Sequence, residues 1–145
     1  MIAKIGNILV EISEVPNLKN SAGSRVLGLS WTGKKTGWIK IQADLELPEF
    51  WDYIEGKCQG SICSVQKKAV MQLLGLTKET LGTIITTPAR AKEFLLRHEL
   101  SHIRHLDSAN QRLNKSGRLS LYRIAIEARA TYEAWLEMLK KYGNI

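Results

Sequence analysis

The sequence predicts an α+β fold, in which a small antiparallel sheet of about three strands packs against a helical bundle. Two observations predict that the strands come first in the chain and the helices follow. Apolar residues come close to alternation in the first 45 residues, and from residue 48 onward they recur at steps of three and four. The length of 145 residues suits one compact domain, so residues 1–145 are expected to form a single unit. Apolar residues at 44% and charged residues at 24% exclude the composition of a disordered chain.

The N-terminal part of the chain is predicted to form the sheet. The first strand is expected within residues 1–12, where apolar residues approach a period of two: Ile2, Ile5, Ile8, Val10 and Ile12. Residues 25–31 and 38–43 are two further strand candidates, and the segment 32–37 (TGKKTG) between them has the composition of a turn. These two strands are therefore expected to pair as a hairpin.

The middle of the chain is predicted to be helical. Pro48 is suited to the first turn of a helix. A second helix is expected over residues 64–74, where apolar residues recur at steps of three and four, with Gly75 as its stop. Residues 77–86 fit either a short helix or an extended segment.

Two long helices are predicted to finish the chain. Thr87 and Pro88 are typical of an N-cap and a first helical residue, and this helix is expected to run to about residue 107. The polar segment 107–117 then connects it to a last helix over residues 118–142.

The first of these helices contains His98-Glu99-Leu100-Ser101-His102, which reads H-E-x-x-H. Residues four apart lie on one helix face, so both imidazoles can reach one cation while Glu99 projects beside them towards a bound water. An accidental match on an amphipathic helix is the alternative, but the helical context and a further available ligand favour a metal site. An apolar stripe is expected to face the core: Leu95, Leu96, Leu100, Ile103 and Leu106.

A catalytic zinc ion commonly has three protein ligands, so one more ligand is needed. His105 is seven residues from His98, about 10 Å along the helix axis, which is too far for one ion to bridge. His105 is therefore expected at the surface or behind a ligand. Asp107 is retained as a minor alternative ligand.

Glu127 is the better candidate for the third ligand. It borders the inward, apolar stripe of the last helix, where a carboxylate is costly to bury unless a cation receives it. The alternative is that Glu127 pairs with a buried arginine. Glu133 and Glu137 are expected on or near the outer face of this helix, as solvated side chains.

H-E-x-x-H on one helix, followed some two dozen residues later by a glutamate on a second helix, resembles the gluzincin zinc metallopeptidases. The short form, in which N-terminal strands precede the helices and residues 126–130 (IEARA) supply the glutamate, is similar to small bacterial and phage proteins of the ImmA/IrrE type. The resemblance covers residues 90–135.

This resemblance implies one Zn²⁺ per chain, held by His98, His102 and Glu127, with Glu99 as the general base. Some gluzincins carry an aspartate four residues after the ligand glutamate, where it orients a zinc histidine. This chain has Thr131 at that position, and its hydroxyl could make a weaker version of the contact.

The chain is therefore predicted to be a zinc metallopeptidase that hydrolyses a peptide bond in a protein or peptide substrate. Zinc would lower the pKa of its bound water, and Glu99 would take the proton as the water attacks the carbonyl carbon. The substrate is expected to lie alongside an edge strand. The oxyanion-stabilising group is left open among His105, Tyr53, Tyr122, Tyr132 and several arginines.

The net charge of +7 permits binding to nucleic acid, although the sequence shows no recognised DNA-binding motif or aromatic-basic stripe. One alternative function is a nucleic-acid-associated protein with the same metal site. Another is a non-catalytic protein that binds a partner.

A cytoplasmic protein without a membrane partner is expected. No apolar run approaches the roughly 20 residues that a membrane-spanning helix needs. Cys58 and Cys63 lack a second Cys or His pair nearby and are expected to be free thiols. The oligomeric state and the role of residues 46–86 are left open.

Overall fold

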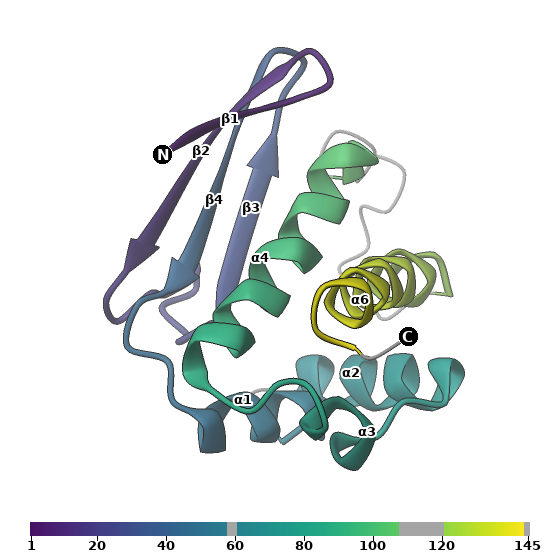
Figure 1. Ribbon diagram of the computed structural model, residues 1–145. Helices are drawn as coiled ribbons and strands as arrows, with labels where there is room; N and C mark the ends of the chain where they lie inside the picture. The colour runs from purple at the N-terminus through teal and green to yellow at the C-terminus, as the bar shows by residue number, and fades with distance from the viewer. Residues whose placement is uncertain (58–60, 108–120, 144–145) are drawn as a thin grey trace.

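The chain folds into a sheet with helices packed against one of its faces, and the α+β class is confirmed (Figure 1). The computed structural model describes residues 1–57, 61–107 and 121–143, without the side chains of residues 61–66, 121 and 122. The predicted polar connection therefore lies almost wholly outside the described residues, as do Cys58 and the side chain of Cys63.

The sheet has four strands in the order β1-β2-β4-β3. The β1/β2 and β3/β4 pairs are antiparallel, whereas β2 and β4 are parallel. The sheet is thus mixed, with one strand more than the sequence predicted. The bounds of the strands are β1 (Ile2–Ile5), β2 (Ile8–Val15), β3 (Gly28–Thr32) and β4 (Thr36–Gln42).

The extra strand arises because a turn at Gly6 divides the first predicted strand. Gly6 has a φ of 60°, a conformation that glycine adopts without steric cost. Ile2, Ile5 and Ile8 are spaced by three rather than two, and Ile5 pairs with Ile8 across the turn. The parallel pair arises because the β3–β4 hairpin, which was predicted correctly, places its second strand beside β2. Alternation within a strand cannot show which strand of a hairpin joins a neighbour.

Five helices are described, and the local signals for them hold. The side chain of Thr87 caps α4 by accepting from the backbone N–H of Arg90 at 3.2 Å. Gly75, with a φ of 65°, follows α2. The ambiguous segment 77–86 contains a short helix. The bounds are α1 (Leu47–Ile54), α2 (Ser61–Leu74), α3 (Lys78–Gly82), α4 (Pro88–Arg104) and α6 (Leu121–Tyr142).

Helix α4 lies between the sheet and α6 (Figure 1), so its residues contact both layers. Leu95 and Ile103 are buried in the core, as predicted, together with Phe94. Leu106 was wrongly predicted to be buried. It follows the end of α4 with a φ of 55° and leaves 40% of its surface exposed, because the helix stops three residues earlier than expected. Within the described residues, none of the helices has both the length and the apolar character needed to cross a bilayer.

Candidate metal centre

Three side chains from α4 and α6 converge at one point. They are the predicted ligands His98, His102 and Glu127, whose ligand atoms all lie within 4.8 Å of one another. The two Oε atoms of Glu127 lie 3.0 Å from His98 Nε2 and 3.1 Å from His102 Nε2. The two Nε2 atoms are 3.2 Å apart. The structure therefore brings together the three residues that the sequence singled out.

These distances suit a divalent metal ion. In a tetrahedral site with bonds of 2.0 to 2.2 Å, neighbouring ligand atoms are about 3.3 Å apart. The two Nε2 atoms have a similar separation of 3.2 Å, and each lies close to one oxygen of Glu127. Two imidazole nitrogens and one carboxylate oxygen form a donor set that several first-row metals accept, and three protein ligands leave a coordination position open. The group could thus hold a metal ion, while its geometry alone does not select the element.

Helix geometry and small side chains explain this convergence. His98 and His102 lie one turn apart on α4, with ring centroids 4.8 Å apart. On α6, Ala130 and Ala134 follow Glu127 at steps of three and seven, and both are buried. Because interaxial distances depend on the size of the side chains in contact, alanines here let α6 approach the histidines.

His102 is held from behind by a carboxylate. Its Nδ1 lies 2.8 Å from Asp107 Oδ2, and Arg129 donates to both oxygens of Asp107, to Oδ1 at 2.6 Å. If Nε2 binds the metal, Nδ1 carries the proton and donates it to Asp107, which fixes the tautomer and the ring orientation. Asp107 therefore supports His102 rather than joining the ligand group, which corrects its minor role as a candidate ligand.

His98 is held from behind by a hydroxyl. Thr131 Oγ1 lies 3.4 Å from His98 Nδ1, the weaker contact that the sequence predicted. The buried Lys67 donates to Thr131 Oγ1 at 3.5 Å and to the hydroxyl of Tyr53 at 3.3 Å. Lys67 thus links the hydroxyl of Tyr53 to Thr131, on the Nδ1 side of His98.

Glu99 is fixed by an edge strand of the sheet. The hydroxyl of Ser30 on β3 donates to Glu99 Oε2 at 2.5 Å. Gly28, two residues earlier on the same strand face, allows this approach, because a Cβ there would lie 3.2 Å from Glu99 Oε1. Sequence reasoning missed both residues, since alternation identifies a strand but not which strand meets the motif.

The charges around the centre shift the pKa values of its groups. Burial lowers the pKa of His102, but hydrogen bonds to Asp107 and Glu127 and the negative charges of Glu127 and Glu99 raise it more, to about 10. Burial raises the pKa of Glu127, yet the two histidines outweigh that effect and bring it well below its usual value. The carboxylate is therefore ionised at neutral pH, as a metal ligand must be.

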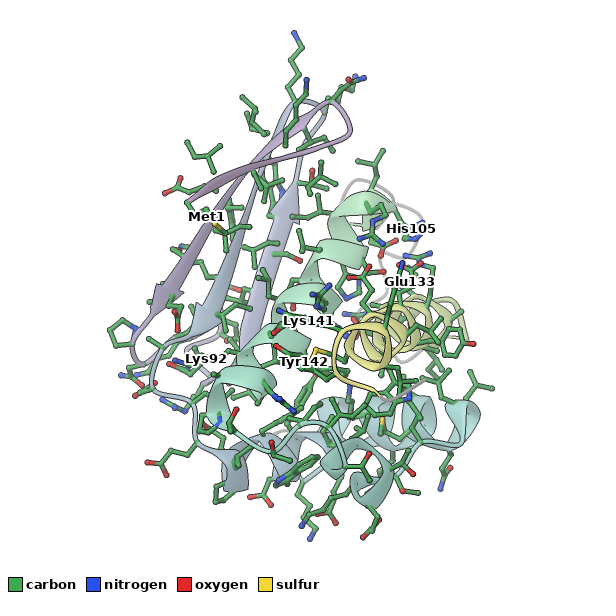
Figure 2. All side chains as sticks on the ribbon, viewed as in Figure 1. Met1, Lys92, His105, Glu133, Lys141 and Tyr142 are labelled. Carbon is green, nitrogen blue, oxygen red and sulfur yellow. The ribbon has the colours of Figure 1, made fainter. Side chains whose placement is uncertain are left out.

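A separate polar network joins the end of α4 to α6. Figure 2 shows His105 and Glu133 there, with His105 Nε2 2.8 Å from Glu133 Oε1. Ser101 and Arg104 also donate to Glu133. His105 is exposed, in agreement with the prediction. Glu133 was wrongly predicted to be freely solvated. It lies at the seam between α4 and α6, because the contact between these two helices extends beyond the apolar stripe of α6. Glu137 pairs with Arg97 at the same seam.

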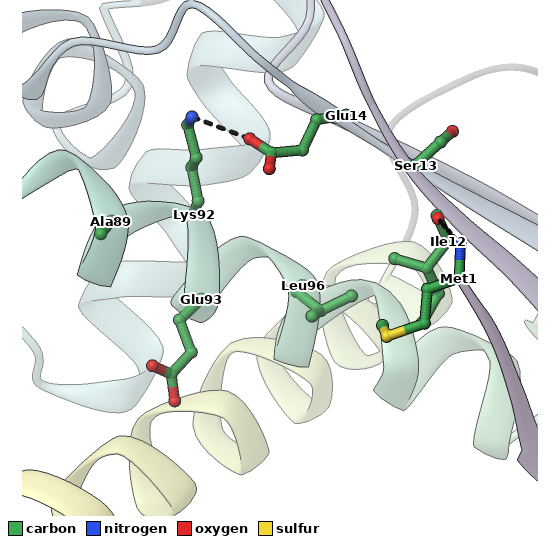
Figure 3. A pocket seen from close by; sticks show the side chains of 8 residues that line it. All are labelled: Met1, Ile12, Ser13, Glu14, Ala89, Lys92, Glu93 and Leu96. Carbon is green, nitrogen blue, oxygen red and sulfur yellow. Dashed lines mark hydrogen bonds and ion pairs between the residues drawn. The ribbon is translucent and has the colours of Figure 1, made fainter.

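An open hollow between β2 and the first half of α4 contains none of the predicted ligands (Figure 3). Its charged groups already have partners. Lys92 pairs with Glu14 at 2.8 Å, and the amino group of Met1 donates to the carbonyl of Ile12 at 3.2 Å. The hollow therefore does not extend the metal centre.

Comparison of the chain with protein-family models, with curated proteins and with solved structures gave no match. The function is therefore inferred from the residues themselves and from their geometry.

Proposed function

We propose that the chain is a zinc-dependent metallopeptidase that hydrolyses a peptide bond in a protein substrate. The observation that carries this proposal is the convergence of His98, His102 and Glu127, with the acid Glu99 next to a ligand on the same helix. The likeness of this H-E-x-x-H helix and its later glutamate to gluzincin peptidases supports the choice of reaction.

The three ligands would hold one Zn²⁺ through Nε2 of each histidine and a carboxylate oxygen of Glu127. When bound, zinc lowers the pKa of a water molecule towards neutrality and polarises a carbonyl group. Asp107 and Thr131 would keep the Nδ1 protons of the two imidazoles, so that both Nε2 lone pairs face the ion.

Glu99 would move the proton. Ser30 occupies Oε2, while Oε1 accepts no hydrogen bond from any described residue. In this role Oε1 takes a proton from the attacking water and then gives it to the amine that leaves. Ser30 acts by orientation, since its hydroxyl fixes the carboxylate that transfers the proton.

The substrate would lie along β3. This strand has β4 on one side only, and its other edge has no strand partner within the described residues. The carbonyl of Leu27 accepts from Gln42 on β4, so by alternation the backbone groups of Gly28 and Ser30 face the open edge. An extended peptide that added there would pass beside Glu99.

The test compares the zinc-loaded protein with Glu99→Gln, which keeps the size of the side chain but cannot take the proton. Each is incubated with a proteome-derived peptide library, new amino termini are identified by mass spectrometry, and bound zinc is measured in parallel. We expect new termini with the native protein, loss of them in Glu99→Gln by at least about 100-fold, and equal zinc content in both.

Glu137→Gln, which changes an acid at the outer seam of α6, is the matched control and should cleave as the native protein does. If the zinc-loaded native protein produces no new termini, the peptidase proposal is wrong and a non-catalytic, partner-binding role takes its place.

A further inference from the structure

The outer face of the sheet, opposite α4, has no described helix over it (Figure 1). Residues directly opposite one another in the register share a face. One row across the sheet therefore consists of Ile2, Glu11, Trp38 and Trp31. Val10, Ile39 and Ile41 alternate with this face and are buried, so the row points to solvent.

Trp31 presents an accessible ring on this face. It leaves 46% of its surface exposed. One part of the ring lies over Gly33 in the hairpin turn, where an added Cβ would be 3.0 Å from its Cη2 atom. The ring stacks on no other described aromatic ring, although Trp38 is its partner in the register. A planar ring is thus open to stacking from solvent.

Positive charge without acidic partners lies on the same face of the sheet as this ring. Four exposed lysines lie on or beside the face, and no described carboxylate lies within 4.0 Å of any of them: Lys4, Lys34, Lys35 and Lys40. The N–H of Leu9 donates to the carbonyl of Lys35, and Lys4 pairs with Leu9, so the turn and β1 bring their lysines to one end of the sheet. Lys40 lies over the ring of Trp38.

The lysines on the helical side of the molecule differ from those on the outer face of the sheet. Most of the described ones pair with acids, as Lys92 does with Glu14 and Lys141 with Glu93. Glu11 is the acid on the outer face. Among the described residues, this face therefore has four lysines without an acidic partner against one glutamate.

From this combination we infer that the outer face of the β3–β4 hairpin binds single-stranded nucleic acid. Trp31 stacks on a base, and Lys34, Lys35 and Lys40 contact phosphates. Unpaired bases expose the ring faces that an indole needs, whereas a duplex keeps them stacked inside. A second copy of the chain would bring the same lysines against one another. The surface lies across the sheet from α4, so the inference does not depend on the proposed peptidase activity.

The test is a fluorescence titration of the full chain with a 12-nucleotide oligothymidylate between 50 and 200 mM salt. Three or four phosphate contacts give a salt slope of about −2 to −3 for a single strand, which is about a 20- to 50-fold loss of affinity across this range. Trp31→Ala should weaken binding by about 5- to 100-fold, while Trp31→Phe, which can still stack, should retain most of it.

Charge variants separate this face from general basicity. Lys34→Glu with Lys35→Glu should weaken binding and flatten the salt slope. Lys57→Glu with Lys78→Glu, on the helical side, should change neither. His102→Ala should bind the oligonucleotide as the native chain does. A failure of the peptidase proposal can therefore be told apart from a failure of this inference.

Three outcomes would overturn the inference. The first is equal affinity for a blunt duplex of the same length or for polyglutamate, which would indicate charge alone or an acidic protein partner. The second is binding that Trp31→Ala leaves unchanged. The third is self-association that depends on Trp31, measured by sedimentation, without oligonucleotide binding.

Discussion

His98 and His102 lie one helical turn apart and face the same point, yet they are supported in different ways. Behind His102 stands the carboxylate of Asp107, which Arg129 keeps ionised and in place. Behind His98 stands the neutral hydroxyl of Thr131, with the ammonium group of Lys67 beyond it. A carboxylate makes an imidazole more basic and fixes its tautomer, whereas a hydroxyl next to a cation mainly fixes orientation. We therefore expect His102 to be the stronger ligand.

The largest effect should come from Glu127, the acid that the two histidines share. Glu127→Ala removes a ligand and leaves both imidazoles with only their own supports, so zinc affinity should fall by at least about 100-fold. Competition with a chromogenic chelator measures the loss. Glu133→Gln, on the same helix but off the centre, should stay within about threefold of the native affinity. Retention of native affinity by Glu127→Ala would show that the ligand group is wrong.

The next effect concerns pH and is specific to His102. Its pKa of about 10 in the metal-free protein means that it is protonated at neutral pH. Metal binds the neutral ring and displaces that proton, so affinity should rise about tenfold per pH unit, or about 100-fold from pH 6 to pH 8. Chelator competition across this range provides the measurement. An affinity that stays flat would mean that His102 is already neutral.

Asp107→Asn tests the anionic support directly. It keeps the shape of the side chain but removes its charge, and it leaves Arg129 without its partner. Zinc affinity should fall by about 10- to 100-fold. The pKa of His102 should also fall, because the hydrogen bond to Asp107 helps to raise it. The rise of affinity with pH should therefore level off earlier than in the native protein. An unchanged pH profile would argue against this support.

Thr131→Val tests the neutral support and should have the smallest effect on the metal. The contact that it removes is long, at 3.4 Å, so zinc affinity should fall by less than about tenfold, with Thr131→Ser close to native. The stability of the fold should suffer more, by about 1 to 3 kcal/mol, because a buried ring N–H loses its acceptor. Denaturant unfolding measures the second quantity. A metal loss larger than that of Asp107→Asn would reverse the comparison.

Local signals in the sequence account for the helices and for the ligand set. Thr87 and Pro88 fix where α4 starts, the four-residue spacing places both histidines on one face, and Glu127 borders the apolar stripe of α6. The predictions of burial and exposure failed for residues at the edges of these patterns. Leu106 lies past the end of α4. Glu133 accepts a hydrogen bond from Ser101, and the apolar stripe of α6 did not indicate that the two helices come close enough for this contact.

The residues that hold the site residues in place could not be predicted from such local signals. Ser30, Lys67 and Arg129 lie 69, 64 and 22 residues from the groups that they contact, and nothing in their own neighbourhoods marks them. The surface formed by Trp31 and by lysines from the β3–β4 turn, β1 and β4 has the same origin. In the sequence its members are ordinary strand and turn residues, and only the pairing of the strands places them on one face.

The sequence by itself determined the α+β class, the motif-bearing helix and the three residues that meet at the candidate metal centre. These follow from periodicity, capping and residue spacing, which act over one or two turns of helix. The tertiary structure alone decided the mixed strand order, the pairing of Glu99 with Ser30 and the unequal supports of His98 and His102. Those features depend on which surfaces pack together, and packing is set by the whole core rather than by any local segment.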